Sequence, residues 1–446
     1  MTGEAGEGDP GIDEDERAAR LQALLSVRVA ARQDELGPGP LEGRRRRATA
    51  SADDEVPGPP LDDGTGLRRR IGARTVLATL VLLGLFATGA GLVYAGTRII
   101  RSSTEGEVVA EQTDPAAPGY EAIVSPTPTM LVVHDVEGTV ASLAVLTLPD
   151  AAAGGGGVIL VPTRTVADIP VLGYAPIEAA YDLGTADLQV EVVGDVLNAG
   201  IGEVVIVDDE RWEGLVAPVA PLTIDNPDDI EVDGEVRFPA GPLDLQAEDV
   251  GAYLEAGLEG ESDLARLFRH RTFWTAWLDA VAASDDPAAV PGELESGVGR
   301  FVRTLAAGQS VVETLPVEST TVEGFDDEPT FLPEAEEVAA LVAELVPLPR
   351  SPGFGARPRV RVLNGTDDLE EARAVALDLP PVGVEVVAVG NARTLDQGTT
   401  TIAYVNPSHE AAAEDIRDLL GVGDVFVDPR PSDVVDITVT LGADHD

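Results

Sequence analysis

The sequence predicts an α/β chain with a single transmembrane helix, a larger α/β sandwich domain and a small α+β domain. Three observations indicate this fold class: an uncharged apolar run, a long alternation of strand-like and helix-like segments, and a regular strand and helix order near the end. We expect six regions: a disordered cytoplasmic tail (1–70), the transmembrane helix with its flanks (71–101), a polar stalk (102–128), the larger domain (129–318), a linker (319–357) and the small domain (358–443).

Composition excludes several classes of function. The 446 residues carry a formal net charge of -49, contain no Cys, and include 30 basic residues that are all Arg. The chain therefore forms no disulfide and has no thiol nucleophile, and its scattered His residues do not suggest a His-rich metal site. So acidic a surface repels phosphates, and we expect no nucleic-acid partner. Whether the acidity reflects a salty habitat or a function is left open by the sequence.

The apolar run at 75–97 is predicted to cross a membrane. It holds no charged residue, and about 20 apolar residues suffice to span the hydrocarbon core. Arg residues at 44–47, 68–70 and 74 precede it, whereas only Arg98 and Arg101 follow closely. This excess predicts a single-pass protein of the cell membrane, with a cytoplasmic N-terminus and extracellular C-terminal domains. Before the run, acidic and Pro/Gly-rich pieces predict disorder.

Segments of the larger domain alternate in the way an α/β sandwich requires. Strand patterns are expected at 130–136, 139–148, 157–162, 203–208, 222–227 and 235–241. Helix patterns are expected at 175–184, 185–200, 209–220, 262–283 and 293–308. This order favours a sheet with helices on both faces.

The small domain follows a Pro/Gly-rich stretch at 346–358. Strands are expected at 359–365, 384–390, 399–405 and 436–442, and helices at 367–379 and 407–420. This βαββαβ order is typical of ferredoxin-like folds, and we predict that fold here.

Positive charge gathers in "DLARLFRHRTFW", residues 263–274. Arg266 and Arg269 are three positions apart, so on a helix they would share one face and could bind a single anion. Ser262 is a good N-cap, and Asp263 suits the first turn. The alternative is that these Arg residues only pair with surrounding acids, and the sequence alone does not decide between the two.

"VRVLNGT" (360–366), "VGNA" (389–392) and "DITVTLGADH" (436–445) closely resemble the LytR C-terminal domain, which is common in envelope proteins of high-GC Gram-positive, actinobacterial type. The larger domain resembles the LytR-CpsA-Psr family over 161–184, 203–227 and 259–281. The resemblance implies a membrane-anchored enzyme that transfers glycopolymers from a polyprenyl-pyrophosphate lipid to peptidoglycan. It also implies that Arg266 and Arg269 grip the pyrophosphate.

The same resemblance makes Arg164, Arg266, Arg269 and Arg271 the anion-binding candidates, with Asp263 and His270 in support. Mg²⁺ would be needed if the site is catalytic, and its ligands are unknown. Several companion residues of the family are missing. Its "PRDT" is "PTRT" here, its Arg-x-Arg pair falls on 253–255, which hold no Arg, and its Asn falls on Glu178. Losing several cations should cost powers of ten in rate.

We therefore expect a pseudoenzyme, a non-catalytic binding or scaffold protein of the cell envelope. Its partner would be a cell-wall glycopolymer, peptidoglycan or an envelope transferase. The alternative is a divergent transferase or pyrophosphatase acting on a polyprenyl-pyrophosphate-linked glycopolymer. A third reading is a signalling protein whose cytoplasmic tail engages a partner.

Overall fold

The computed structural model describes residues 112–445, apart from 184–185, 233, 258–260, 293–295, 323–324, 326–328, 354, 367–369 and 431–433. The predicted tail and transmembrane run lie outside these residues. Among the helices of the described part, none has both the length and the apolar character needed to cross a membrane. All described residues belong to one compact unit, Ile99–Asp446.

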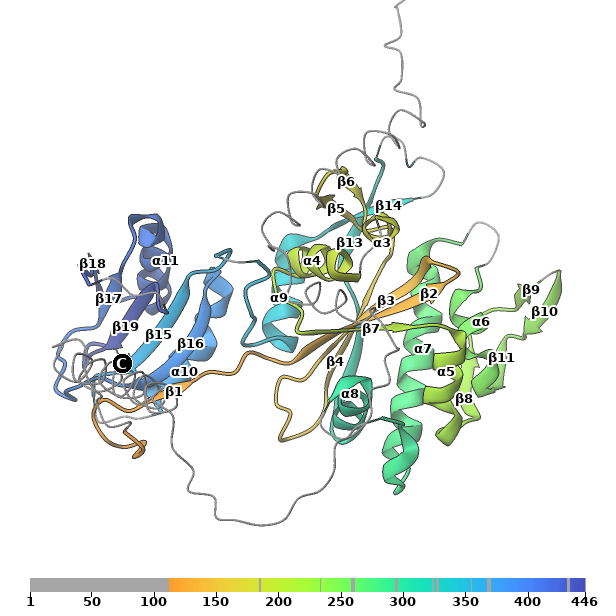
Figure 1. The fold of residues 1–446 in the computed structure, drawn as a ribbon, viewed down its shortest axis with the longest axis horizontal. Coiled ribbons are helices and arrows are strands. Elements are labelled where there is room, and N and C mark those ends of the chain that lie inside the picture. The colour runs from red at the N-terminus through yellow and green to blue at the C-terminus, as the bar shows by residue number, and fades with distance from the viewer. Residues whose placement is uncertain are drawn as a thin grey trace, which may run out of the picture. The chain divides into compact units, whose positions relative to one another are not determined.

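A five-stranded mixed sheet forms the centre of the larger domain, which confirms the predicted α/β class (Figure 1). The strand order is β12-β4-β3-β2-β7, with the outer pairs parallel and the inner pairs antiparallel. Alternate side chains of one strand enter opposite cores, Met130 on one face and Leu131 on the other, as the two-residue period of a strand requires. The strands are β2 (Thr129–Val136), β3 (Thr139–Thr147), β4 (Gly156–Val161), β7 (Glu203–Val207) and β12 (Ser310–Thr314).

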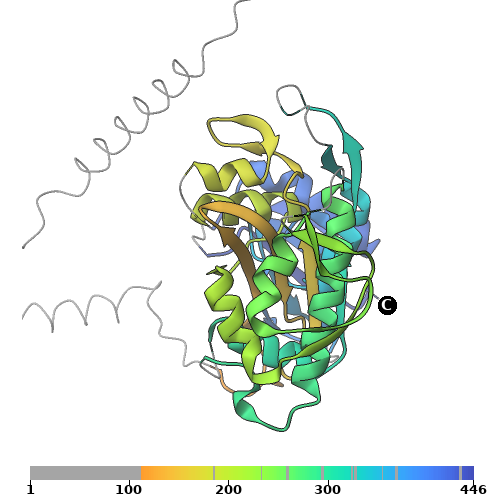
Figure 2. The same cartoon turned by 90° about the vertical axis from the view of Figure 1, so that its right-hand side faces the viewer.

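Helices cover both faces of this sheet. One core contains residues of α5 (Asp209–Val216), α6 (Val250–Glu255), α7 (Asp263–Ala282) and α8 (Gly297–Ala306), and in Figure 2 the green helices of this layer face the viewer. The opposite core contains residues of α3 (Glu178–Asp182), α4 (Ala186–Leu197) and α9 (Ala335–Leu345).

Four antiparallel strand pairs surround the sheet. They pair β5 (Val166–Ile169) with β6 (Gly173–Pro176), β8 (Leu222–Asn226) with β11 (Gly241–Leu245), β9 (Ile230–Val232) with β10 (Glu235–Phe238), and β13 (Val317–Thr320) with β14 (Thr330–Pro333). β14 and α9 lie in the stretch expected to be a linker. They belong to the larger domain, because Val338, Val342 and Leu345 of α9 are buried in its core.

The small domain is not ferredoxin-like. Its strands are ordered β1-β16-β15-β19-β17-β18, and β15 pairs in parallel with β16, the next strand along the chain. The predicted arrangement would have placed another strand between those two. A strand at 424–427 was also missed, because it is short and mostly exposed. The elements are β15 (Arg359–Asn364), α10 (Glu371–Asp378), β16 (Glu385–Asn391), β17 (Thr401–Tyr404), α11 (Glu410–Leu420), β18 (Asp424–Val427) and β19 (Ile437–Leu441).

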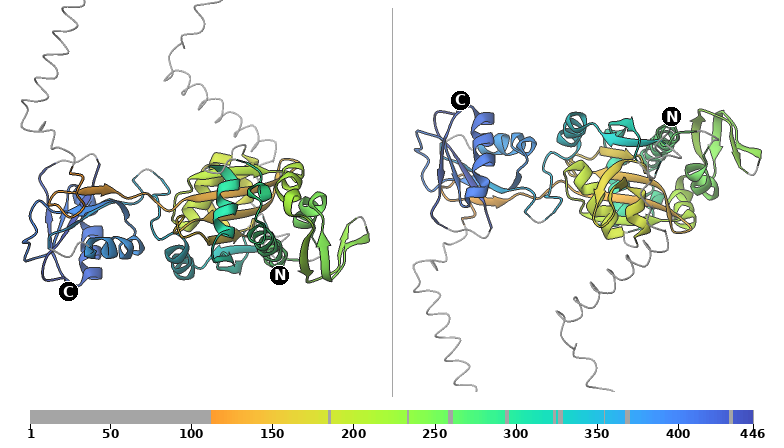
Figure 3. Two further views of the ribbon diagram at one scale, coloured as in Figure 1. Left: turned by 90° about the horizontal axis from the view of Figure 1, so that it is seen from below. Right: turned by 90° about the horizontal axis from the view of Figure 1, so that it is seen from above.

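The stretch expected to be a polar stalk supplies the sixth strand of this sheet. β1 (Glu121–Ile123) pairs antiparallel with β16, and Figure 3 shows the orange strand beside the blue sheet. The side-chain amide of Asn391 donates to the carbonyl oxygens of Pro115 and Ala117 at 2.8 and 2.9 Å. A three-residue strand has too little pattern to be recognised in sequence, and its partner lies far along the chain.

A candidate anion-binding site at the start of helix α7

Asp263 joins two segments that the sequence placed in one site. One of its oxygens, Oδ1, accepts a hydrogen bond from Nη2 of Arg266 at 2.7 Å. The other, Oδ2, accepts from the hydroxyl of Thr163 and the backbone N–H of Arg164, both at 3.4 Å. The Asp263 side chain is only 4% exposed. The start of α7 and the loop after β4 therefore meet at this carboxylate.

Arg164 is held by protein groups around its whole guanidinium. Nη1 donates to Oε1 of Glu178 on α3 at 3.3 Å. Nε and Nη2 donate to the carbonyl oxygens of Pro329 and Phe325, both at 3.1 Å. These bonds attach the loop after β4 to α3 and to the segment before β14.

Arg266 keeps one donor that the described protein groups do not use. Its side chain is 20% exposed, and its Nε, which is buried, has no hydrogen-bond partner among the described residues. Burial raises the pKa of nearby Glu255, and the acids Asp209 and Glu137 raise it further, whereas the charge of Arg266 opposes the shift. Arg266 thus lies among several carboxylates.

Arg269 does not share an anion site with Arg266. It is 1% exposed, pairs with the carboxylate of Glu261, and donates from Nη2 to the carbonyl oxygen of Ala256. The three-residue spacing puts both Arg side chains on a similar face of α7. Arg269, however, is enclosed by the segment that precedes the helix. The expectation that the two guanidinium groups jointly face one anion is not met in this arrangement.

The two remaining candidates also have protein partners. His270 is buried, and because its ring can only donate to a carbonyl, its Nε2–H donates to the oxygen of Leu254 at 2.8 Å. Burial lowers the pKa of His270 to about 3, with a further contribution from Arg266, so the ring is neutral. Arg271 pairs with Glu313 on β12 at 3.0 Å and is partly exposed. The structure therefore brings Arg164, Arg266 and Asp263 together and places Arg271 elsewhere.

The structure adds a His–Asp pair that the sequence did not single out. Nε2 of His134 lies 3.2 Å from Oδ1 of Asp209, and His134 is fully buried. His134 is in register with Val207 of the parallel neighbour β7, so the carboxyl ends of β2 and β7 meet there. Burial lowers the pKa of His134, whereas the hydrogen bond to Asp209 raises it. Polar residues ending two apolar strands were the available signal.

Asp209 reaches His134 because α6 passes close to it at a glycine. A side-chain Cβ at Gly251 would lie 2.0 Å from Oδ1 of Asp209. Any other residue at 251 would therefore displace the carboxylate. A second pair, Tyr181 donating to Asp135, ties α3 to the end of β2.

The acids present do not fit a Mg²⁺ site in this arrangement. Asp263 is the acid that contacts both Arg164 and Arg266, and both of its oxygens already accept hydrogen bonds from protein donors. No group of three or more His, Asp or Glu side chains within the described ranges is placed to hold a metal ion. The structure thus gives the predicted metal no defined set of ligands.

Aromatic rings fill the space between the sheet and α7. Trp212 of α5 contacts Phe273, Trp274 and Trp277 of α7, with ring centroids 5.4 to 5.9 Å apart. All four are buried, and they include every tryptophan of the chain. We call these four residues the aromatic cluster. It packs into the core that also contains Met130 and Val132 of the central strand β2.

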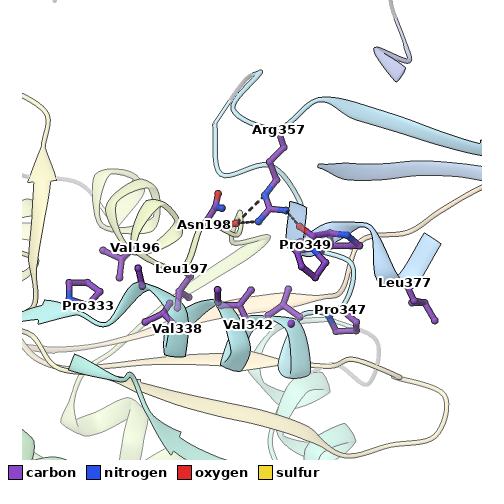
Figure 4. A pocket seen from close by; sticks show the side chains of 16 residues that line it. Val196, Leu197, Asn198, Pro333, Val338, Val342, Pro347, Pro349, Arg357 and Leu377 are labelled. Atoms are coloured by element: carbon purple, nitrogen blue, oxygen red, sulfur yellow. Dashed lines mark hydrogen bonds between the residues drawn. The ribbon is translucent and has the colours of Figure 1, made fainter. Parts of the chain in front are cut away.

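A cavity lies away from the Arg candidates (Figure 4). It has a volume of about 270 Å³ and is lined mainly by apolar residues of α4, α9 and the following segment. Arg357, at its edge, is buried and donates to the carbonyl oxygen of Asn198 at 2.6 and 3.1 Å and to those of Pro380 and Val384. This arginine ties the small domain to the end of α4.

Comparison with known proteins identifies the small domain. Residues 357–445 match the family model described as LytR cell envelope-related transcriptional attenuator. The chain therefore carries a LytR C-terminal domain, as its motifs predicted. Proteins of curated function give no significant match to the sequence.

Three solved structures illustrate what this chain is similar to. TagV of B. subtilis is 21% identical, with 50% of this chain and 98% of TagV covered and a TM-score of 0.41. A transcriptional regulator of Enterococcus faecalis is 20% identical (49% and 88% covered, TM-score 0.40). B. subtilis TagT is 18% identical (53% and 93% covered, TM-score 0.40). TagT, a LytR-CPS2A-psr family protein, has also been solved with a bound octaprenyl pyrophosphate lipid.

Proposed function

We propose that this chain is a membrane-anchored, non-catalytic protein of the cell envelope, a binding or scaffold relative of glycopolymer-to-peptidoglycan transferases. The LytR C-terminal domain supports an envelope role. The sequence resemblance of the larger domain supports a glycopolymer, peptidoglycan or an envelope transferase as the partner. The run at 75–97 would anchor it, with the N-terminus in the cytoplasm and the described domains outside.

The observation that carries this proposal is the pairing of every candidate arginine with an acid. The pairs are Arg164–Glu178, Arg266–Asp263, Arg269–Glu261 and Arg271–Glu313. A pyrophosphate that displaced Asp263 would leave a nearly buried carboxylate without its charge partner, and such a loss costs several kcal/mol. The positive charge that a transferase needs for its substrate is already neutralised by the protein.

The aromatic cluster supports the same proposal. A transferase acting on a polyprenyl lipid needs an apolar channel that leads to its cations. In this chain the layer between sheet and α7 is occupied by the four packed rings. Protein interiors pack at the density of organic crystals, so a polyprenyl chain could enter this layer only by displacing rings.

The alternative, a divergent transferase or pyrophosphatase, is favoured by one observation. Arg266 is partly exposed, its Nε has no hydrogen-bond partner among the residues that the structure describes, and Asp263 accepts hydrogen bonds from both Arg266 and the backbone of Arg164. An anion could bind there if Asp263 turned away. Such a site would hold at most two of the four candidate arginines.

A lipid titration separates the two functions. The whole chain, in a mild detergent, is titrated with geranylgeranyl pyrophosphate and Mg²⁺ by calorimetry and by tryptophan emission, which reports only on the aromatic cluster. We expect neither heat of binding nor a change in emission. Micromolar binding that is lost in Arg266→Ala and kept in Arg271→Ala would contradict the proposal. Arg271 is the matched control because it pairs with Glu313 away from the site, and Arg269 is avoided because it is buried.

A further inference from the structure

A groove on the outer side of α7 has a composition that suits a sugar. It runs between α7 and β8, which lie side by side in Figure 1, and has a volume of about 360 Å³. Three threonines, two aspartates, one arginine and one phenylalanine are among the side chains that line it. We propose that this α7–β8 groove binds an uncharged oligosaccharide segment of an envelope glycopolymer, which rests on the proposed function and names its binding surface.

Phe268 supplies the apolar contact. Its side chain lies on the outer face of α7, 66% exposed, whereas its helix neighbours Leu267 and Arg269 are buried. Most of the surface of this ring is therefore open to a ligand. The axial C–H bonds of a pyranose ring carry partial positive charge, so a sugar face suits the negative face of an aromatic ring.

Polar groups along the groove supply hydrogen bonds for hydroxyl groups. The carboxylates of Asp225 and Asp279 and the hydroxyl of Thr275 have no hydrogen-bond partner within the described ranges. Thr272 donates to the carbonyl of Phe268, which leaves its oxygen able to accept. Carboxylates accept hydrogen bonds, and hydroxyls both accept and donate them. Both kinds of group can therefore bind the hydroxyls of a sugar. The groove thus combines one aromatic face with several separated polar groups. In ligand sites, polar groups placed in this way fix the orientation of the ligand.

Charge decides the class of glycan. Residues 98–446 hold 18 Arg and 64 Asp or Glu, a net charge of -46. The one cation among the lining residues of the groove, Arg271, is already paired with Glu313, and the lining also contains the carboxylates of Asp225 and Asp279. A phosphate-rich polymer would be repelled both locally and by the whole domain. Among glycopolymers, this charge favours an uncharged one over a phosphate-bearing one.

Affinity electrophoresis of the whole chain in detergent tests this proposal. Native gels contain either arabinogalactan as the uncharged probe or poly(glycerol phosphate) as the charged one, and retardation gives the dissociation constant. We expect retardation by arabinogalactan only, weakened roughly tenfold in Phe268→Ala and retained in Phe268→Trp. Tyr174→Ala is the matched control, since Tyr174 is an exposed aromatic (73%) on the β5–β6 hairpin, outside the groove.

The outcomes also separate this proposal from the proposed function. The groove would be ruled out as the binding surface if Phe268→Ala left arabinogalactan binding unchanged, or if Tyr174→Ala weakened it equally. A non-catalytic glycan-binding role would still stand in either case. Binding of poly(glycerol phosphate) alone, or of neither polymer, would overturn the groove's ligand. Turnover of a polyprenyl-pyrophosphate substrate would instead overturn the proposed function and says nothing of Phe268.

Discussion

Replacing Trp212 by alanine tests whether the aromatic cluster is a packed layer. Trp212 is buried and contacts three rings of α7, so it joins α5 to α7 across the face of the central sheet. If the rings fill this layer, removing the central one leaves a cavity that the rigid sheet on one side cannot close. The same substitution would cost little if the layer were loose or reserved for a ligand.

The magnitude follows from the buried area and one unpaired donor. A buried tryptophan removes roughly 200 Å² from water, and at about 25 cal/mol per Å² this corresponds to about 5 kcal/mol, of which alanine keeps about 1. The indole Nε1–H has no acceptor among the described residues, so its removal recovers about 1 kcal/mol. We therefore expect Trp212→Ala to lower the free energy of unfolding by about 3 kcal/mol, within the range of large-to-small core substitutions.

Urea unfolding of the whole chain, followed by far-ultraviolet circular dichroism, measures this loss. Tryptophan emission is unsuitable because the substitution removes one of its three sources. Trp212→Phe is the matched control, since it keeps a ring and removes the unpaired N–H, and we expect a loss below about 1.5 kcal/mol. A loss below about 1 kcal/mol for Trp212→Ala would refute the packed layer and remove one support for a non-catalytic role.

Three further predictions use the same unfolding measurement. Arg269→Ala should cost about 3–5 kcal/mol because it leaves a buried carboxylate unpaired, whereas Arg271→Ala should cost under about 1 kcal/mol; equal losses would contradict the burial of Arg269. The pKa of His270 falls from 6.5 to about 3 on folding, so only the unfolded chain gains its proton between these values. Stability is therefore lost as pH falls below 6.5, and His270→Gln should lose about 2 kcal/mol less than wild type between pH 7 and 5. Arg357→Ala should cost about 2–4 kcal/mol by leaving carbonyls such as that of Asn198 unpaired; a loss under 1 kcal/mol would show that the link to α4 is dispensable.

Much of the fold could be predicted because its signals are local. Runs rich in Val and Leu at 130–136 and 139–148 predicted strands, and β2 and β3 lie there. Ser262 marked the start of α7, where its hydroxyl accepts from the N–H of Ala265. The motifs at 360–366 and 436–445 identified the LytR C-terminal domain. Each of these signals is carried by a few neighbouring residues.

The candidate site was predicted only in part, for a physical reason. The sequence by itself located the Arg-rich start of α7 and the loop at Arg164, and it determined the acidity from which we expect no nucleic-acid partner. Tertiary structure alone decided that Arg271 is neutralised by Glu313, because these residues are 42 positions apart and meet only where α7 crosses β12. It likewise decided that β15 lies beside β16 and that the stalk adds a strand. Periodicity reports which face of an element is buried, whereas charge partners and strand neighbours depend on how distant elements pack.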